Sequence, residues 1–288
     1  VMADGYGIGS ATHATIRQVR SADMLNAATI DHRWTPSDSS AKWTASVLRS
    51  DARGAYEDAS NHDSFATLSE WGDTTLGAVT GNNSFFCLSP ARIRELGLTD
   101  DELVRLSPPG SRHLRGLTLS SAQLHNLGQA GSATALFRPG SVPSDAAQRY
   151  IDAGHKAGVD LASNCRIRKP WWRVPLVRPA DLLLTYMNGD TPRLTTNLAG
   201  AHHLNSVHGV YLSGNVKSLG RQLLPLASLN SVTLLSAELV GRAYGGGMLK
   251  IEPREADQLV LPSALVVEGA SGALSSIRPQ VRRALAQG

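Results

Sequence analysis

The sequence predicts an α+β fold, in which mixed sheets of short strands pack with helices. The chain has 288 residues, 42% of them hydrophobic, which is enough to bury a sizeable core. Short apolar runs typical of strands are spread along it, and segments with helix-capping residues lie between them. The leucines between Ser218 and Val240 recur at helical spacing, which predicts buried helices there.

The N-terminal part carries few signals of regular structure. Between Val1 and Val19, two short apolar runs flank a glycine-rich turn at Gly5–Gly9, which predicts a hairpin. Residues 20–64 are polar and irregular, and Thr35–Ser40 is the most linker-like piece. We therefore expect three parts: a hairpin over residues 1–20, a linker or irregular segment over 21–70, and a compact domain over 71–288.

The compact domain opens with two expected strands on either side of a turn. Leu76–Gly81 resembles a strand that enters the turn, and Phe85–Leu88 resembles a strand that leaves it. Thr134–Phe137 and Met248–Ile251 predict two further short strands. From Glu268 onward the residues are small and polar, and no element is assigned there.

Helices are predicted from their capping residues. Ser89 and Pro90 supply the cap and the first-turn proline of a helix that ends at Gly97. Ser144 caps a helix that runs to about Ala157. Thr99–Glu102 and Ser120–Gln123 are capping boxes, each of which opens a helix. Ser218–Val240 predicts a leucine-rich pair of helices interrupted near Pro225, and Pro253–Leu259 predicts a helix that begins at its proline.

Composition excludes several classes of protein. No stretch approaches the ~18 consecutive apolar residues that a membrane-spanning helix needs, so we expect no membrane partner. Cys87 and Cys165 are too few for a disulfide framework and too far apart for a metal knuckle. The first residues show no secretory signal, and the lack of an initiating Met fits a start within a longer protein. We expect a cytoplasmic protein.

The net charge of +4 is modest, but 23 of the 28 basic residues are Arg. The planar fork of Arg suits phosphate and guanine edges, which would fit a nucleic-acid partner. A genome whose base composition favours Arg codons explains the same ratio equally well. Charge alone is therefore a weak indicator of function.

The segment Asp4–Gly9 offers the type of glycine-rich loop that holds a nucleotide. Such a loop should follow a full buried strand and open a helix. Here three residues precede it and a β-branched, histidine-containing segment follows, so a simple turn is favoured. A small self-sufficient nucleotide-binding enzyme stays as the alternative, which tight binding of S-adenosylmethionine or a dinucleotide would support.

No catalytic residue is assigned to this chain. Ser107–Gly110 resembles half of the tetrad by which amino-methyltransferases hold the target amine, but Gly110 cannot stack on a flipped base, so we interpret it as a proline-rich loop. Metal-dependent nucleases of the commonest restriction fold need an acid two residues before the catalytic Lys. The residues at those positions are Ser40, Gly154, Ile167, Asn215 and Met248, none of them acidic.

Three histidines, His202, His203 and His208, cluster in the sequence. A zinc site would need a fourth ligand and a helical i, i+4 spacing, which they do not show. Hydrogen bonding beside Asn197 and Asn205 is the better interpretation. We therefore expect no metal ion.

Two clusters point to nucleic acid. Arg166–Arg173 interleaves cations with two indole rings, so it could hold phosphate while a ring stacks on a base, each stack worth ~1–3 kcal/mol. The alternative is that Trp171 or Trp172 is a core anchor. Arg242–Lys250 holds three consecutive glycines, which suggest close approach of a ligand such as a DNA phosphate, with a flexible turn as the alternative.

Four stretches follow one another along the chain in a recognisable order: Thr80–Phe86, Arg168–Trp172, Pro192–Gly200 and Tyr244–Pro253, the last being the most specific. In these stretches and in their order, the chain resembles, over roughly residues 70–265, the C-terminal half of gamma-class adenine DNA methyltransferases and related fused restriction-modification enzymes. In that family this half is the target-recognition domain, which clamps duplex DNA against a separate catalytic domain. That domain carries the methyl-donor loop and the Asn-Pro-Pro-aromatic tetrad, and this chain shows neither motif.

The resemblance implies that the chain recognises double-stranded DNA for a site-specific adenine methyltransferase. S-adenosylmethionine is then expected on a catalytic domain or subunit outside this chain, and residues 1–20 resemble the last strands of that domain's sheet. A protein-interaction module that never touches DNA is the other alternative. The candidate DNA-binding residues are Asn82, Asn83, Arg112, His113, Lys169, Trp172, Arg173, Arg193, Asn197, Arg242, Tyr244, Gly245, Gly246 and Lys250.

Overall fold

The computed structural model describes residues 48–286 and, before them, residues 14–16, 21, 23, 24, 32–34 and 44. The chain divides into two compact units, residues 1–58 and 59–288, and each is described by itself. In the first unit, β1 (Ala14–Ile16) pairs antiparallel with β2 (His32–Trp34). The turn expected at Gly5–Gly9 lies outside the described residues.

A helix, α1 (Ser50–Ser60), lies in the segment that the sequence predicts to be irregular. That interpretation was wrong for this stretch. Its sequence consists mostly of small and charged residues and shows little apolar periodicity, so it carries no clear signal of a helix. The limits expected for the three parts of the chain stay a prediction.

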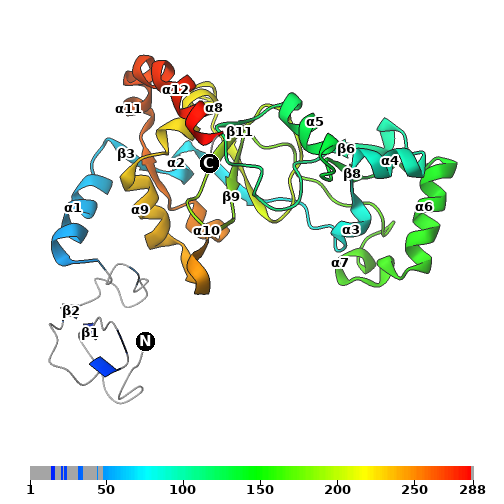
Figure 1. The fold of residues 1–288 in the computed structure, drawn as a ribbon, viewed down its shortest axis with the longest axis horizontal. Coiled ribbons are helices and arrows are strands. Elements are labelled where there is room, and N and C mark those ends of the chain that lie inside the picture. Colours follow the sequence, from blue (N-terminus) through cyan, green and yellow to red (C-terminus); the bar gives the residue numbers. More distant parts are fainter. Residues whose placement is uncertain are drawn as a thin grey trace. The chain divides into compact units, whose positions relative to one another are not determined.

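The second unit is built around a five-stranded mixed sheet (Figure 1). Its strands, in spatial order, are β4 (Gly72–Leu76), β12 (Val207–Leu212), β9 (Leu182–Thr185), β11 (Leu194–Asn197) and β7 (Thr118–Leu119). Only β7 and β11 run parallel, and the other neighbours are antiparallel. The α+β class predicted from the sequence is confirmed.

Side chains of the central strands alternate between two hydrophobic cores. Leu182 and Leu184 lie in one core, and Leu183 between them lies in the other. Helices of the first core, gathered at one end of this unit in Figure 1, are α8 (Lys217–Ala227), α9 (Ser231–Val240), α10 (Pro253–Ala256), α11 (Ala264–Gly269) and α12 (Ser271–Leu285). Because these strands are buried on both faces, their sequence lacks the alternation of polar and apolar residues that predicts a strand.

Two short elements precede the sheet and pack on the first core. Strand β3 (Phe65–Thr67) pairs antiparallel with β15 (Val260–Pro262), and α2 (Leu68–Trp71) follows it directly. The buried indole of Trp71 donates its N–H to the carbonyl of Pro262 at 3.1 Å. This contact ties the start of the unit to its C-terminal part.

The other end of the unit has its own sheet and an aromatic core. Three antiparallel strands lie in the order β5 (Cys87–Leu88), β8 (Ala135–Phe137) and β6 (Leu103–Arg105). Around them lie α3 (Asn83–Phe86), α4 (Pro90–Leu96), α6 (Asp145–Lys156) and α7 (Ser163–Arg166), as Figure 1 shows, while α5 (Ser121–Gln129) covers the second face of the central sheet. The rings of Phe85 and Tyr150 stack at 4.4 Å.

Most helix predictions are confirmed, because the caps form as expected. Ser89, Ser120 and Ser144 accept backbone hydrogen bonds at the starts of α4, α5 and α6. The break in the leucine-rich segment falls after Ala227, and Pro225 lies inside α8. The hydroxyl of Thr196 donates at 2.7 Å to the carbonyl of Arg221, the helical acceptor that a proline at position 225 leaves without its usual N–H donor.

Four expectations need correction. Phe85 and Phe86 belong to helix α3, because the Asn82 side chain accepts the N–H of Phe85 and starts a helical turn; only Cys87–Leu88 is a strand. The first strand ends at Leu76, and the helix from Pro253 ends at Ala256. Residues after Glu268 form α12, whose small side chains hide its period.

Among the described residues, no single helix is long and apolar enough to span a membrane; the bent pair α8 and α9 meets the requirement only when the two are taken together.

Candidate nucleic-acid interface

Segments far apart in the sequence are joined into one continuous edge of the second unit, here called the polar edge. It consists of residues 242–250, 186–193, 107–115, 203–206, 78–83 and 166–173, in that spatial order. These segments include almost all of the residues that the sequence analysis selected as DNA-binding candidates. The contacts that join them run as follows.

At one end, called the hairpin end, β13 (Arg242–Tyr244) and β14 (Met248–Lys250) form a hairpin, and β14 also pairs with β10 (Met187–Asn188). The hydroxyl of Ser111 donates to the Met187 carbonyl at 3.2 Å, and the backbone N–H of Gly110 donates to Ser206 Oγ at 3.0 Å. The proline-rich loop is therefore held against both neighbours.

The other end is called the strip end, after Arg166–Arg173. Asn205 N–H donates to the Ala78 carbonyl at 3.1 Å. The guanidinium of Arg168 donates to the Thr80 carbonyl at 2.7 Å and to the carbonyl of Val79. In Figure 1 this edge runs from the hairpin beside α10 to α7.

The tip of the hairpin is exposed. Tyr244 and the three glycines after it have no buried member. Gly246 and Gly247 have φ of +77° and +78°, so these two positions need glycine for the turn itself. Gly245 has no positive φ, and nothing lies within 4 Å of the Cβ it would carry. Neither the turn nor packing within this chain explains a glycine at position 245.

The cations at the base of this hairpin are paired within the chain. Arg242 Nε donates to the buried carboxylate of Glu255 at 2.8 Å, and Lys250 Nζ lies 2.6 Å from Glu252 Oε1. Hydrogen bonds to Glu252 and Tyr186 raise the pKa of Lys250. Both residues were predicted to contact DNA, and their charges are offset by neighbouring carboxylates.

The loop from Ser107 to Leu114 carries one exposed cation, Arg112. Behind it, Ser107 is 1% exposed and its hydroxyl lies 2.7 Å from His113 Nε2. Burial lowers the pKa of His113 to about 4, so this ring is neutral at pH 7 and cannot supply charge to a phosphate. Arg112 makes no ion pair with any residue that the structure describes.

A second guanidinium of this loop is paired. Arg115 forms a bidentate ion pair with Asp190, in which Nη1 lies 2.8 Å from Oδ1. Burial lowers the pKa of Arg115, and the charge of nearby Arg193 lowers it further. Arg193 is half-buried, and its backbone N–H donates to Thr185 Oγ1 at 2.9 Å. The side chain of Arg193 makes no ion pair with a described residue, and its buried Nε has no hydrogen-bond partner among them.

At the strip end the rings and the cations separate. Trp171 packs on Phe85 and Phe86, with ring centroids 5.5 Å and 6.2 Å away, and Trp172 meets Trp171 edge-on at 6.0 Å. Both indoles are half-buried against the aromatic core, so the core-anchor interpretation holds for the pair. The exposed cations of this strip make no ion pair within the described part of the chain; they are Arg166, Lys169 and Arg173.

The model of the family described as Type II methyltransferase M.Eco57I, C-terminal domain, matches residues 40–287. The chain belongs to this family. It is similar to Type II methyltransferase M.XamI of Xanthomonas campestris pv. amaranthicola, 30% identical over 201 residues, which are 65% of this chain and 34% of that protein. Type II methyltransferase M.AccI of Acinetobacter calcoaceticus is 22% identical over 205 residues, 70% of this chain and 38% of its own. The chain thus spans little more than a third of these relatives, and the resemblance inferred from sequence is confirmed for the family.

Within this Type II methyltransferase C-terminal domain, Asn82 and Asn83 lie on the polar edge beside the strip. Asn82 Oδ1 accepts hydrogen bonds from Phe85 N–H and Ser84 Oγ, and Asn83 Oδ1 accepts one from Thr80 Oγ1 at 2.5 Å. The Oδ1 atom of each side chain therefore accepts hydrogen bonds within its own segment, and the Nδ2 group is the donor that remains for a partner. Asn83 is the more exposed of the two.

Asn197 does not lie on the surface. It is 2% exposed, and its Nδ2 donates to the carbonyls of Ala180 and Ala201 at 3.0 and 2.9 Å while its Oδ1 accepts the Ala201 N–H at 3.1 Å. The two bonds to Ala201 close the turn after β11, and the bond to Ala180 joins this turn to the residues before β9. Its selection as a DNA contact was wrong, because a buried amide with three backbone partners is structural.

Two of the three clustered histidines bond backbone carbonyls, and the third, His203, is buried. His208 Nε2 lies 2.7 Å from the Ile251 carbonyl, and His202 Nδ1 lies 2.9 Å from the Val177 carbonyl. Burial lowers the pKa of His203 to about 4. Among the residues described, no group of three or more His, Cys, Asp or Glu side chains could hold a metal ion.

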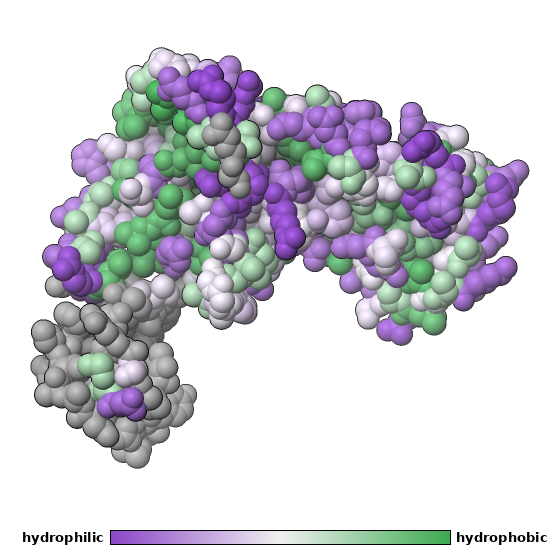
Figure 2. Space-filling model, viewed as in Figure 1, coloured by the Kyte–Doolittle hydropathy of each residue, from purple (hydrophilic) through white to green (hydrophobic). Residues whose placement is uncertain are grey.

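Sequence reasoning selected Tyr244 but missed the other exposed apolar side chains of the polar edge, which are Val79, Ile167 and Met187. The exposed fractions are 40% for Val79, 79% for Ile167, 39% for Met187 and 50% for Tyr244. Figure 2 shows hydrophilic and hydrophobic surface side by side along this part of the unit. Of the three missed positions, only Ile167 had a signal, because it stands between two arginines in the strip. The other positions become neighbours through tertiary contacts alone.

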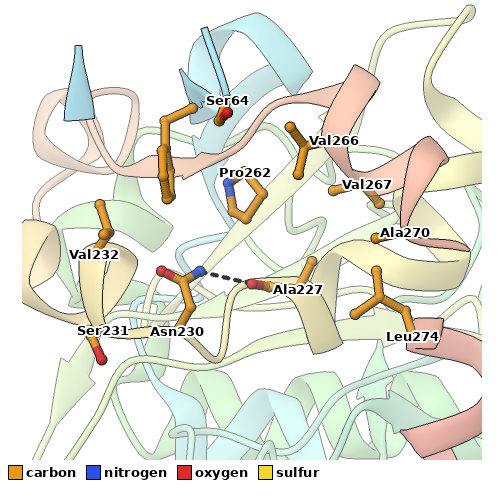
Figure 3. Close-up of a pocket in the computed structure, with 11 residues that line it drawn as sticks. Ser64, Ala227, Asn230, Ser231, Val232, Pro262, Val266, Val267, Ala270 and Leu274 are labelled. Carbon is orange, nitrogen blue, oxygen red and sulfur yellow. Dashed lines mark hydrogen bonds between the residues drawn. The ribbon is translucent and has the colours of Figure 1, made fainter. Parts of the chain in front are cut away.

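An apolar cavity of about 320 Å³ lies apart from the polar edge, between β3, β15, α9, α11 and α12 (Figure 3). Its lining includes Phe65, Val267 and Leu274 and no charged side chain. The Asn230 amide at its rim donates to the Ala227 carbonyl at 2.8 Å and to Thr233 Oγ1. A charged methyl donor would find no counter-charge there, so this cavity is no candidate for a cofactor site.

Proposed function

We propose that this chain recognises duplex DNA, in the cytoplasm, for a site-specific adenine DNA methyltransferase. The observation that carries the proposal is the polar edge, which bears both exposed apolar side chains and exposed cations that have no carboxylate partner among the described residues. Cations of this kind bind phosphates, and apolar groups contact sugars and the thymine methyl group. An exposed set of both kinds on one rigid edge fits a nucleic-acid partner.

Methyl transfer itself is assigned to a catalytic domain or subunit outside these residues. That part would bind S-adenosylmethionine, whose methyl group passes to the exocyclic amine of adenine. Support comes from the loop at Ser107, the one described segment that resembles part of a catalytic tetrad. Its hydroxyl is buried and hydrogen-bonded to His113, so it is not available to hold a target amine. The proposal also fits a chain that covers 34% and 38% of its relatives.

Duplex binding by the whole 288-residue chain tests the proposal. Fluorescence anisotropy with a labelled duplex is measured between 50 and 300 mM salt. The three exposed cations of the strip end, which have no ion pair among the described residues, predict a slope of log K against log salt of about −2.7, at roughly 0.9 per phosphate. Binding without salt dependence, or none at all, would contradict it and favour a protein-interaction module.

A second measurement addresses adenine. The chain is combined with the catalytic part of its own methyltransferase, S-adenosylmethionine labelled in the methyl group, and duplex DNA. Label should appear in N-methyladenine after digestion to nucleosides. Label in methylcytosine would refute adenine as the target base.

A further inference from the structure

We infer that Arg112 reads a guanine in the DNA target and so determines part of the sequence specificity. The inference rests on the proposed function, because it requires the polar edge to contact DNA. It assigns direct base recognition to one side chain and leaves phosphate binding to the strip end. Three features of the loop from Ser107 to Leu114 carry it.

The first feature is the position of Arg112 in a closed turn. Leu114 N–H donates to the Ser111 carbonyl at 2.9 Å, which closes a four-residue turn with Arg112 and His113 at its centre. Leu114 is fully buried in the core that lies under the central sheet. The turn is therefore anchored directly behind Arg112, whose own side chain is exposed.

The second feature is the support of this turn from other segments. Ser107 N–H donates to the His202 carbonyl at 2.8 Å, and the Ser107 hydroxyl holds His113 at 2.7 Å. Gly110 and Ser111 make the contacts to Ser206 and Met187 described above. A base-reading side chain must be held in register by such supporting hydrogen bonds, because a loose loop loses specificity.

The third feature is charge. Arg115, Arg242 and Lys250 each have a carboxylate within 3 Å, and Arg193 is half-buried; Arg112 is the exposed cation of this end that has no carboxylate partner among the described residues. An unpaired guanidinium can donate two hydrogen bonds in the plane of a base, and guanine presents two acceptors at matching spacing in the major groove. The strip end instead places several cations along one segment, an arrangement suited to successive phosphates.

The test is selection of duplexes from a pool randomised over twelve base pairs, followed by sequencing of the bound fraction. It compares the wild-type 288-residue chain with Arg112→Ala, Arg112→Lys and, as a matched control at the strip end, Arg166→Ala. The wild type should enrich guanine at one or more positions. In Arg112→Ala the preference for guanine at one of these positions should fall by roughly 5- to 150-fold, while preferences at other positions persist.

The control separates base reading from charge. Arg166→Ala should bind every selected duplex roughly fivefold more weakly, with a salt slope smaller by about 0.9 and with unchanged sequence preference. Arg112→Lys keeps the charge but lacks the planar fork, so it should also lose the guanine preference. Melting temperatures of the variants should match the wild type, since neither Arg112 nor Arg166 makes an ion pair with a described residue.

The outcomes distinguish the two claims. An Arg112→Ala chain that keeps every base preference, or that weakens equally for all sequences, overturns the inference and leaves the proposed function standing. A wild-type chain that binds duplexes without any base preference overturns the inference as well. A wild-type chain that binds no duplex overturns both.

Discussion

The hairpin end and the strip end of the polar edge are both rich in cations, yet they differ in how those charges are used. At the hairpin end, Arg242 faces Glu255 and Lys250 faces Glu252. At the strip end, Arg166 and Lys169 make no ion pair with a described residue, while the tryptophans beside them pack into the core. The number of basic residues in a segment therefore does not show how much charge is available to DNA.

The largest effect is expected from removing the strip's charge. A triple variant, Arg166→Gln with Lys169→Gln and Arg173→Gln, should weaken duplex binding ~100-fold at 0.15 M salt and reduce the salt slope by about 2.7, because three phosphate contacts are lost. The measurement is anisotropy over a salt series. The paired change Arg282→Gln with Arg283→Gln on α12 is the control and should leave the slope unaltered. A triple variant with wild-type affinity would show that the cations of the strip end do not bind DNA phosphates.

Acidification should loosen the hairpin end before the strip end. His113 has a pKa of about 4 through burial, below its unfolded value, so it is neutral when folded; His208 is shifted downward for the same cause. Between pH 4 and pH 6.5, His113 binds more protons in the unfolded chain than in the folded one. Its contribution to stability is therefore complete above pH 6.5 and is lost as the pH drops toward 4. At pH 5 the loss of stability from His113 is ~2 kcal/mol, which corresponds to a ~30-fold rise in the equilibrium constant for local opening.

Hydrogen exchange of backbone amides measures this difference. After correction for intrinsic rates, Gly110 and Leu114 should lose protection between pH 7 and pH 5. Phe86 and Cys165 at the strip end should change less, since they lie in the aromatic core, which contains no histidine among the described residues. Equal loss of protection at both ends would show that the histidines act on the whole unit.

Gly245→Ala separates the demands of the fold from those of a partner. The added Cβ meets nothing within 4 Å and the backbone has no positive φ, so the free energy of unfolding should stay equal or rise by ~0.5 kcal/mol. Duplex binding should weaken about tenfold, because the added methyl group would keep a phosphate away from the backbone N–H of residue 245. Tenfold is about the size of one lost hydrogen bond. Gly140→Ala, also unobstructed, is the control. Unchanged binding would assign Gly245 to a plain turn.

The smallest effect is expected at the base of the hairpin. Arg242→Gln and Lys250→Gln should each leave the salt slope within ~0.3 of the wild type, because their charges already belong to Glu255 and Glu252. The same anisotropy series measures this. A fall of ~0.9 for either variant would show that the lysine or arginine leaves its carboxylate for a phosphate.

Much of the candidate site could be found from sequence, but the roles of its residues could not. The strip and the glycine hairpin were both selected, and both lie on the polar edge. Asn197 was selected as well, although it lies buried with three backbone hydrogen bonds. The sequence does not show whether a polar residue such as Asn197 is buried when the strands around it lack an alternation of polar and apolar residues.

What the sequence determined by itself is what short-range hydrogen bonds control. Ser89, Ser120 and Ser144 each bond a backbone N–H three residues ahead, so their helices start where the sequence places them. The state of each cation was decided by tertiary structure. Arg242 meets Glu255 across 13 positions of sequence, and Arg168 meets the Thr80 carbonyl across 88, so neither contact has a local signal. Charge pairing depends on distance in space, which only the folded chain defines.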